Sequence, residues 1–138
     1  MKKTCFIISI ITLAACTSLP PKPLRGEFVE VSPDAYQKNP IENLTVRWTG
    51  FVVDIENKEE HSCLTIIAKM PDQYARPSKR VRLDQGRFIA CKPKFLEPES
   101  FNEKAVTVTG SVKKLVRKPL GNMEYNYPLV DAQVIYVW

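Results

Sequence analysis

Regular alternation of apolar and polar residues constrains this chain more than any other feature. The segment 104–116 alternates through Val106, Val108, Gly110 and Val112, and the segment 125–138 alternates through Val130, Ala132, Val134, Tyr136 and Trp138. Successive side chains of a strand point to opposite faces, so a period of two predicts strands with one inward face. Runs rich in β-branched and aromatic residues predict further strands at 44–55, 62–70 and 86–92.

The first expected strand changes parity near a glycine. Val46 and Trp48 share one face, and the apolar residues after Gly50 have the opposite parity, at Phe51, Val53 and Ile55. A glycine bulge inside a bent strand produces such a shift. We therefore expect a bulge at Gly50 and a curled first strand.

The order of the expected elements indicates the fold. Between the third and fourth strands, 94–102 has apolar residues spaced for a short helix at Phe95, Leu96, Pro98 and Phe101. Three strands, a short helix and two strands, with glycines interrupting the first and fourth strands, are typical of the five-stranded OB barrel. We predict a mainly β fold, a small OB-like antiparallel barrel over 44–138, with a small antiparallel sandwich as the alternative.

The first fifteen residues have the organisation of a secretory signal. Lys2 and Lys3 precede the apolar stretch 6–13, which is too short to cross a bilayer core that needs around 20 residues. The ending Leu13-Ala14-Ala15-Cys16 resembles the bacterial lipobox. We predict a lipoprotein signal peptide over 1–15 and lipidation of Cys16. Because Thr17 follows Cys16 where an aspartate would indicate inner-membrane retention, the outer membrane is the expected location.

The segment 16–43 is predicted to be a lipidated N-terminus followed by a linker and a cover. Prolines at 20, 21 and 23 make 17–25 typical of an extended, polyproline-like spacer. In 28–43, the stretch 34–37 is expected to form one helical turn that covers one end of the core. The expected domain organisation is therefore a signal peptide at 1–15, this segment at 16–43 and the barrel at 44–138.

Two cysteines remain in the expected barrel. If the strands at 62–70 and 86–92 pair antiparallel, Cys63 and Cys91 fall near one another, out of phase with the core candidates Leu64 and Phe88. Paired cysteines tend to bridge in the oxidising envelope. A disulfide and two separate thiols both remain open.

The basic residues offer contacts for an anionic ligand. The formal charge is +5, and Lys2 and Lys3 are the only charges in the leader, which leaves +3 on the mature chain. Basic residues gather in the connection after the second strand and around the turn after the fourth. We select Arg80, Arg82, Lys113 and Lys114 as candidate contacts, with lipopolysaccharide phosphate or an envelope protein as partner. Periplasmic exposure argues against nucleic acid.

The chemistry of an enzyme is missing from the sequence pattern. The single histidine, His61, lies in a polar turn, and no cluster of His, Cys and carboxylates has metal-ligand spacing. We predict no catalytic residues, metal or cofactor. Tyr74 and Arg76 are expected to be structural, with Tyr74 packing on the barrel and Arg76 satisfying loop carbonyls. Aromatic residues suited either to packing or to sugar stacking are Trp48, Tyr125, Tyr127 and Trp138.

Several short stretches stand out in order along the chain. They are Pro71-Asp72-Gln73-Tyr74-Ala75-Arg76-Pro77, Gly86-Arg87-Phe88-Ile89-Ala90, Phe95-Leu96-Glu97-Pro98, Val106-Thr107-Val108-Thr109-Gly110 and the closing 134–138. With the lipobox, they resemble the Slp family of starvation-inducible outer-membrane lipoproteins. The resemblance implies an outer-membrane lipoprotein linked to stationary phase or stress, and it brings no catalytic residues. We therefore expect a noncatalytic, periplasm-facing lipoprotein with an envelope maintenance or stress-adaptation role, or alternatively a carbohydrate- or lipopolysaccharide-binding accessory module.

Overall fold

The computed structural model describes Ile10 and residues 19–80 and 83–138. The predicted signal peptide, apart from Ile10, and the predicted lipidation site Cys16 lie outside the described residues. Among the described residues, no helix has the length and apolar character needed to span a bilayer.

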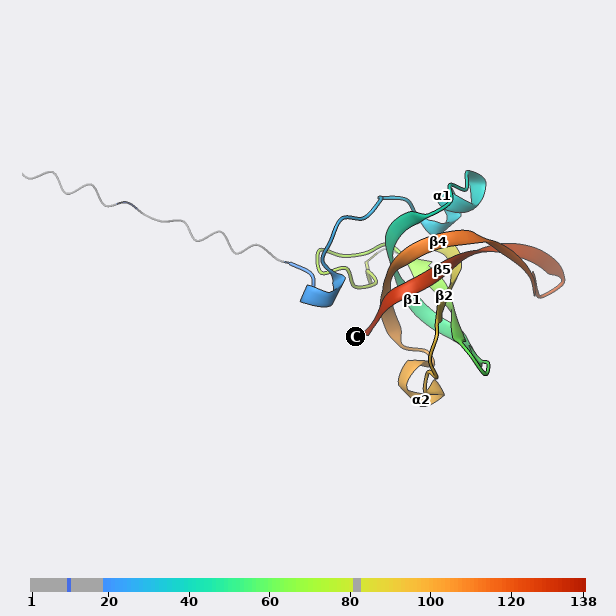
Figure 1. The fold of residues 1–138 in the computed structure, drawn as a ribbon. Helices are drawn as coiled ribbons and strands as arrows, with labels where there is room; N and C mark the ends of the chain where they lie inside the picture. Colours follow the sequence, from blue (N-terminus) through green and yellow to red (C-terminus); the bar gives the residue numbers. More distant parts are fainter. Residues whose placement is uncertain (1–9, 11–18, 81–82) are drawn as a thin grey trace, which may run out of the picture.

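Five strands form the body of the molecule (Figure 1). Their bounds are β1 Leu44–Asn57, β2 Ser62–Lys69, β3 Asp84–Lys92, β4 Ala105–Leu120 and β5 Met123–Val137. They close into a barrel in the order β1-β2-β3-β5-β4. This confirms the mainly β, OB-like prediction. One pair departs from the expected antiparallel arrangement, because β3 meets β5 in parallel at Ile89–Cys91.

The hairpin of β4 and β5 is longer than the sequence pattern predicts. Pairing continues from the barrel out to Leu120 and Met123, and Figure 1 shows the hairpin projecting well beyond the barrel. Lys113 and Lys114 therefore lie within β4, and the prediction that they surround a turn is wrong.

The parity change in β1 occurs after Gly50. Val46, Trp48 and Val52 are all buried core residues of one parity, and the register shifts between Val52 and Asp54. The predicted bulge at Gly50 is thus wrong. Gly50 is required for a different reason, since a Cβ there would lie 2.0 Å from the Ile67 carbonyl oxygen. Phe51 consequently points outward.

A second irregularity corrects the predicted inward face of β5. Val130 and Ala132 are buried in the core, but the register shifts before Val134, so that Ile135 packs against the core instead. Tyr136 and Trp138 therefore lie on the outer side. The ring centroids of Tyr136 and Trp138 are 4.7 Å apart.

Short helices close the ends of the barrel. Helix α1, Pro33–Lys38, is capped by Ser32, whose side chain accepts a hydrogen bond from the Ala35 backbone N–H. The helix buries Tyr36 in the core. Helix α2, Pro98–Phe101, follows the buried Leu96. Both match the predicted helical segments in place, and α1 also has the predicted covering role.

The N-terminal segment packs on the outside of β4 and β5. The 3-10 helix η1, Lys22–Leu24, buries Leu24 completely, and the Leu24 carbonyl accepts a hydrogen bond from Arg47 Nη1 at 2.9 Å. The prediction of an extended spacer over 17–25 is therefore wrong from residue 22 onward. Burial of the apolar Leu24 side chain against the sheet is more favourable in free energy than its exposure to water in an extended spacer.

Candidate binding groove

Polar residues on the outer face of the barrel are buried beneath the β2–β3 connection. Thr49 is 2% exposed and Thr107 is fully buried. The Thr107 hydroxyl donates to the Ala75 carbonyl oxygen and accepts from Trp138 Nε1 at 2.9 Å. Because buried hydroxyls are costly unless hydrogen-bonded, these contacts fix the connection and the Trp138 ring together on the barrel.

Asp72 organises the connection from within. Its Oδ1 accepts hydrogen bonds from the backbone N–H groups of Tyr74 at 2.8 Å and Arg76 at 3.0 Å, and its Oδ2 pairs with Arg76 Nε at 3.0 Å. Burial by itself raises the pKa of Asp72, but these hydrogen bonds and the Arg76 charge outweigh it and leave the pKa below its ordinary value. The carboxylate is thus held in its charged form.

Arg76 is held beside two aromatic rings. Its guanidinium carbon lies 4.8 Å from the Tyr74 ring centroid and 5.9 Å from that of Trp138. Both distances are in the range of cation–π attraction. The expectation that Tyr74 and Arg76 support the loop fits these contacts, although the partner of Arg76 is the Asp72 carboxylate.

These side chains border a groove of about 760 Å³ on the outer surface. Its lining combines aromatic and cationic side chains, including Phe51, Tyr74, Arg76, Lys79, Arg80 and Trp138. Lys79 and Arg80 are exposed. The groove can therefore present flat aromatic surfaces and positive charge to the same ligand.

A second hollow of about 450 Å³ lies under the N-terminal segment, where Phe28 and Arg47 face Met70 and Pro71. Arg47 is already engaged there, because its guanidinium carbon sits 5.0 Å from the Phe28 ring centroid and its Nη1 bonds to the Leu24 carbonyl. This hollow offers a ligand less available charge than the groove does.

The predicted anionic-ligand residues do not gather in one place. Arg80 lines the groove, and Arg82 lies outside the described residues. Lys113 and Lys114 are exposed on β4, roughly 20 Å along the strand from Thr107 at about 3.3 Å per residue. The structure therefore separates a groove region from a hairpin region.

Sequence reasoning missed the joining of three distant segments. Phe51 from β1, the connection at 72–80 and Trp138, which follows β5, meet at one groove. The sequence pattern alone does not show on which face of the barrel Phe51 lies. Its face depends on where β1 bulges, and that position is set by pairing with β2.

Cys63 and Cys91 form a disulfide in the structure, with 4.1 Å between their Cα atoms. They are direct partners in the β2–β3 register, and the core candidates Leu64 and Phe88 on the same two strands are buried, as expected. The bond lies at the end of this strand pair that is remote from the connection. His61 is exposed nearby, and the described residues contain no group of His, Cys, Asp or Glu able to hold a metal ion.

Comparison with known proteins gives a family and several relatives. The model of the outer membrane lipoprotein Slp family matches residues 13–138. Outer membrane protein Slp of Escherichia coli K12 is 28% identical over 148 residues, covering 100% of this chain and 76% of the relative. An uncharacterized protein of Haemophilus influenzae is 27% identical over 142 residues, covering 95% and 76%. Neither name states an enzymatic activity.

Two further comparisons are more distant. The uncharacterized lipoprotein YeaY of Escherichia coli K12 is 29% identical over 92 residues, covering 67% of this chain and 47% of the relative. Among solved structures, the small single-stranded DNA-binding protein of Streptomyces coelicolor matches with a TM-score of 0.44 and 13% identity, over 70% of this chain and 95% of that one. A likeness at this level says nothing about the ligand of this chain.

Proposed function

Because this chain belongs to the outer membrane lipoprotein Slp family, we propose that it is anchored through Cys16 and binds a phosphate-bearing envelope component without catalysing a reaction. Its location is the outer membrane, and the proposed role is envelope maintenance or stress adaptation. The observation that carries the binding proposal is the groove in which Arg76, Lys79 and Arg80 lie beside Tyr74 and Trp138.

The chemistry of the groove suits a phosphate attached to a ring or a lipid headgroup. Guanidinium and ammonium groups bind phosphate through charge-assisted hydrogen bonds, and Lys79 and Arg80 are exposed for this. Trp138, with 36% of the residue accessible, adds an apolar surface on which a sugar or a glycerol can pack.

The same groove favours binding over turnover. Its only acidic side chain among the described lining residues is Asp72. General acid–base catalysis works best with a pKa near the operating pH, whereas the pKa of Asp72 is lowered and its charge is engaged by Arg76. This supports a noncatalytic protein.

The anchor can be tested in cells. Several acyl chains on Cys16 would hold the protein durably, since each buried CH₂ contributes about 0.8 kcal/mol. We expect a metabolic fatty-acid probe to label the parent protein and not Cys16→Ser, which should accumulate unprocessed or soluble. Equal labelling of both proteins would refute lipidation at Cys16.

Ligand binding can be tested with the soluble domain that begins at Thr17. Vesicles containing lipopolysaccharide, vesicles containing phosphatidylglycerol and neutral vesicles distinguish the two sources of phosphate from non-specific adhesion. We expect retention on one anionic kind at low salt, and loss of it in 0.5 M salt because exposed charges are screened.

A matched pair of variants locates the site. Lys79→Gln with Arg80→Gln should weaken binding about thirtyfold, since each cation near an anionic surface contributes about 1 kcal/mol. Lys113→Gln with Lys114→Gln removes the same charge from the hairpin region and should leave binding nearly unchanged. Equal losses in both variants, or equal retention on neutral vesicles, would remove the proposal.

A carbohydrate-binding accessory module is the second candidate, favoured by the Tyr74 and Trp138 rings at the groove. It differs from the first in its salt response. Binding of a neutral oligosaccharide that persists in 0.5 M salt and is lost in Trp138→Ala would favour this second function.

A further inference from the structure

We infer that the side of the barrel formed by η1 and residues 70–80, here called the lipid-facing side, rests on the surface of the bilayer that holds the anchor. The β4–β5 hairpin then points away from that bilayer. The inference rests on the proposed anchor at Cys16, but it does not require a ligand in the groove. The partner of the lipid-facing side is the phosphate-rich headgroup surface of this bilayer.

The distance along the chain from the anchor to the barrel is short. Leu24 is fully buried against the barrel, and the Pro20 carbonyl accepts a hydrogen bond from Arg25 Nε at 2.8 Å. Four residues from Cys16 to Pro20 span at most roughly 14 Å when fully extended. By comparison, a strand of the length of β4, which has 16 residues, rises roughly 50 Å along its path. The tether therefore keeps η1 near the bilayer.

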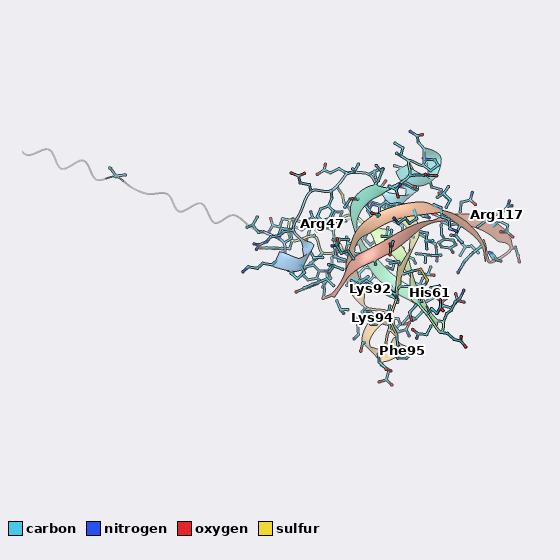
Figure 2. All side chains as sticks on the ribbon, in the orientation of Figure 1. Arg47, His61, Lys92, Lys94, Phe95 and Arg117 are labelled. Carbon is cyan, nitrogen blue, oxygen red and sulfur yellow. A yellow bond between two sulfur atoms is a disulfide. The ribbon has the colours of Figure 1, made fainter. Side chains whose placement is uncertain are left out.

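The β2–β3 connection shares this side with the N-terminal segment. Met70 and Pro71 line the same hollow as Gly26 and Phe28. Figure 1 shows the blue N-terminal segment and the yellow-green connection together on one side, with the hairpin on the opposite side. Figure 2 places Arg47 beside the N-terminal segment and Arg117 out on the hairpin.

The side chains on the lipid-facing side suit the headgroup region of a bilayer. Exposed cations there are Lys22, Arg25, Arg76, Lys79 and Arg80. Exposed apolar residues are Leu19 at 54% and Met70 at 47%, with Trp138 at 36% on the adjoining wall of the groove. Cations are attracted to anionic lipids, and tryptophan is enriched at membrane–water interfaces.

Acidic residues only partly offset this charge. Glu27 and Glu30 are exposed close to η1, and Asp72 is paired with Arg76. On the hairpin, by contrast, Arg117 Nε lies 3.3 Å from Glu124 and Lys118 Nζ lies 3.5 Å from Glu56. Because Lys113 and Lys114 are also exposed on β4, charge by itself does not distinguish the two sides. The short tether, together with the exposed Leu19, Met70 and Trp138, favours the lipid-facing side.

Tryptophan fluorescence can test this orientation in the full lipidated chain. The mature chain has two tryptophans, of which Trp48 is 5% and Trp138 36% exposed. The protein is reconstituted in vesicles of phosphatidylethanolamine and phosphatidylglycerol with a fraction of lipids that carry a nitroxide on the headgroup. We expect the Trp138 emission, taken as the difference from Trp138→Phe, to fall at least twofold.

A probe on the hairpin provides the matched comparison. Met123, which is 65% exposed, is changed by Met123→Trp in the Trp138→Phe background. Its emission should fall by less than a tenth. If Trp138→Phe does not fold, as judged by its thermal unfolding, Met123→Trp in the otherwise unchanged chain keeps the comparison, because the added emission should then be insensitive to the nitroxide.

Charge reversal tests whether the cations of the lipid-facing side contribute to the orientation. Lys22→Glu with Arg25→Glu alters the lipid-facing side outside the groove and should reduce Trp138 quenching at least twofold, whereas Lys113→Glu with Lys114→Glu should leave it unchanged. Hairpin emission quenched as strongly as Trp138 overturns the inference, even when the protein floats with the vesicles. Protein that does not float with the vesicles shows instead that the anchor, and with it this inference, is wrong.

Discussion

The two ends of the long β4–β5 hairpin differ in what holds them. At the groove end, fully buried Thr107 connects Trp138 to the Ala75 carbonyl, and buried Leu24 covers the adjoining sheet. At the projecting end, the backbones of the two strands pair out to Leu120 and Met123, and the exposed Arg117–Glu124 ion pair joins their side chains. Burial and satisfied polar groups stabilise the first end, while exposed ion pairs contribute about 0.2–1 kcal/mol each.

The difference shows where a rigid site can be built. Binding residues need a scaffold that holds their rotamers. In the groove, Asp72 holds Arg76 and Thr107, buried on the barrel, holds Trp138. The hairpin has a similar wealth of cations without such support. Cations occur in both regions, but only those of the groove lie on a buried framework, and the candidate site is therefore the groove.

The largest effect should come from a glycine in the barrel. Gly110→Ala would place a Cβ 2.1 Å from the Asp131 carbonyl oxygen, so the paired backbones would have to separate. We expect a loss of at least about 4 kcal/mol in the free energy of unfolding. At the hairpin turn, Gly121→Ala meets nothing within 4 Å and only has to tolerate φ +61°, which costs about 1 kcal/mol. Urea unfolding of both variants measures the contrast, and similar losses would contradict it.

Removing the disulfide should have the next largest effect. Cys63 and Cys91 are 28 residues apart, so the bond closes a loop whose entropy in the unfolded chain corresponds to about 3.5 kcal/mol. The variant Cys63→Ser with Cys91→Ser should lose roughly this amount in urea unfolding. The oxidised parent treated with reductant is the control and should shift by a similar amount. No shift in either sample would show that the bond does not form.

Truncation of Leu24 tests the packing of the N-terminal segment. Leu24→Ala empties a fully buried position, and such changes cost about 3 kcal/mol. Met123→Ala, at 65% exposure on the hairpin, should change the free energy of unfolding by less than about 0.5 kcal/mol. If the two variants unfold alike, η1 does not pack on the barrel in solution.

The smallest effect concerns Asp72 and depends on pH. Asp72→Asn keeps an oxygen for the Tyr74 and Arg76 backbone N–H groups but loses the ion pair, so about 0.5–1 kcal/mol should be lost at pH 7. The pKa of Asp72 is lowered in the folded chain, so its contribution is present above the unfolded pKa of about 3.9. That contribution is lost as pH falls through the lower folded value.

The gap between the parent and Asp72→Asn should consequently narrow below about pH 4. Chemical unfolding at pH 7, 4 and 2.5 measures it. Glu124→Gln removes the exposed hairpin carboxylate and provides the control, with a loss below about 0.5 kcal/mol at pH 7. A gap for Asp72→Asn that widens at low pH would be inconsistent with a lowered pKa.

Much of the fold could be predicted from the sequence, because pleated strands impose a period of two on the residues they bury. The five strands, the helical turns near residues 34–37 and 98–101, and the outward phase of Cys63 and Cys91 all follow from local pattern. The family also follows from short motifs that survive in order along the chain.

What only the tertiary structure decided is where each strand changes parity and what covers the outer face. The bulges after Val52 and Ala132 are set by cross-strand register around a closed barrel. The first lies beyond Phe51 and leaves it on the outer face, and the second turns Trp138 outward. Burial of Thr107 depends on a connection that follows β2 and returns across β4. The sequence by itself determined the strands, the motifs and the positive charge. The assembly of the groove needed long-range contacts, because neither register nor loop packing is encoded in any single segment.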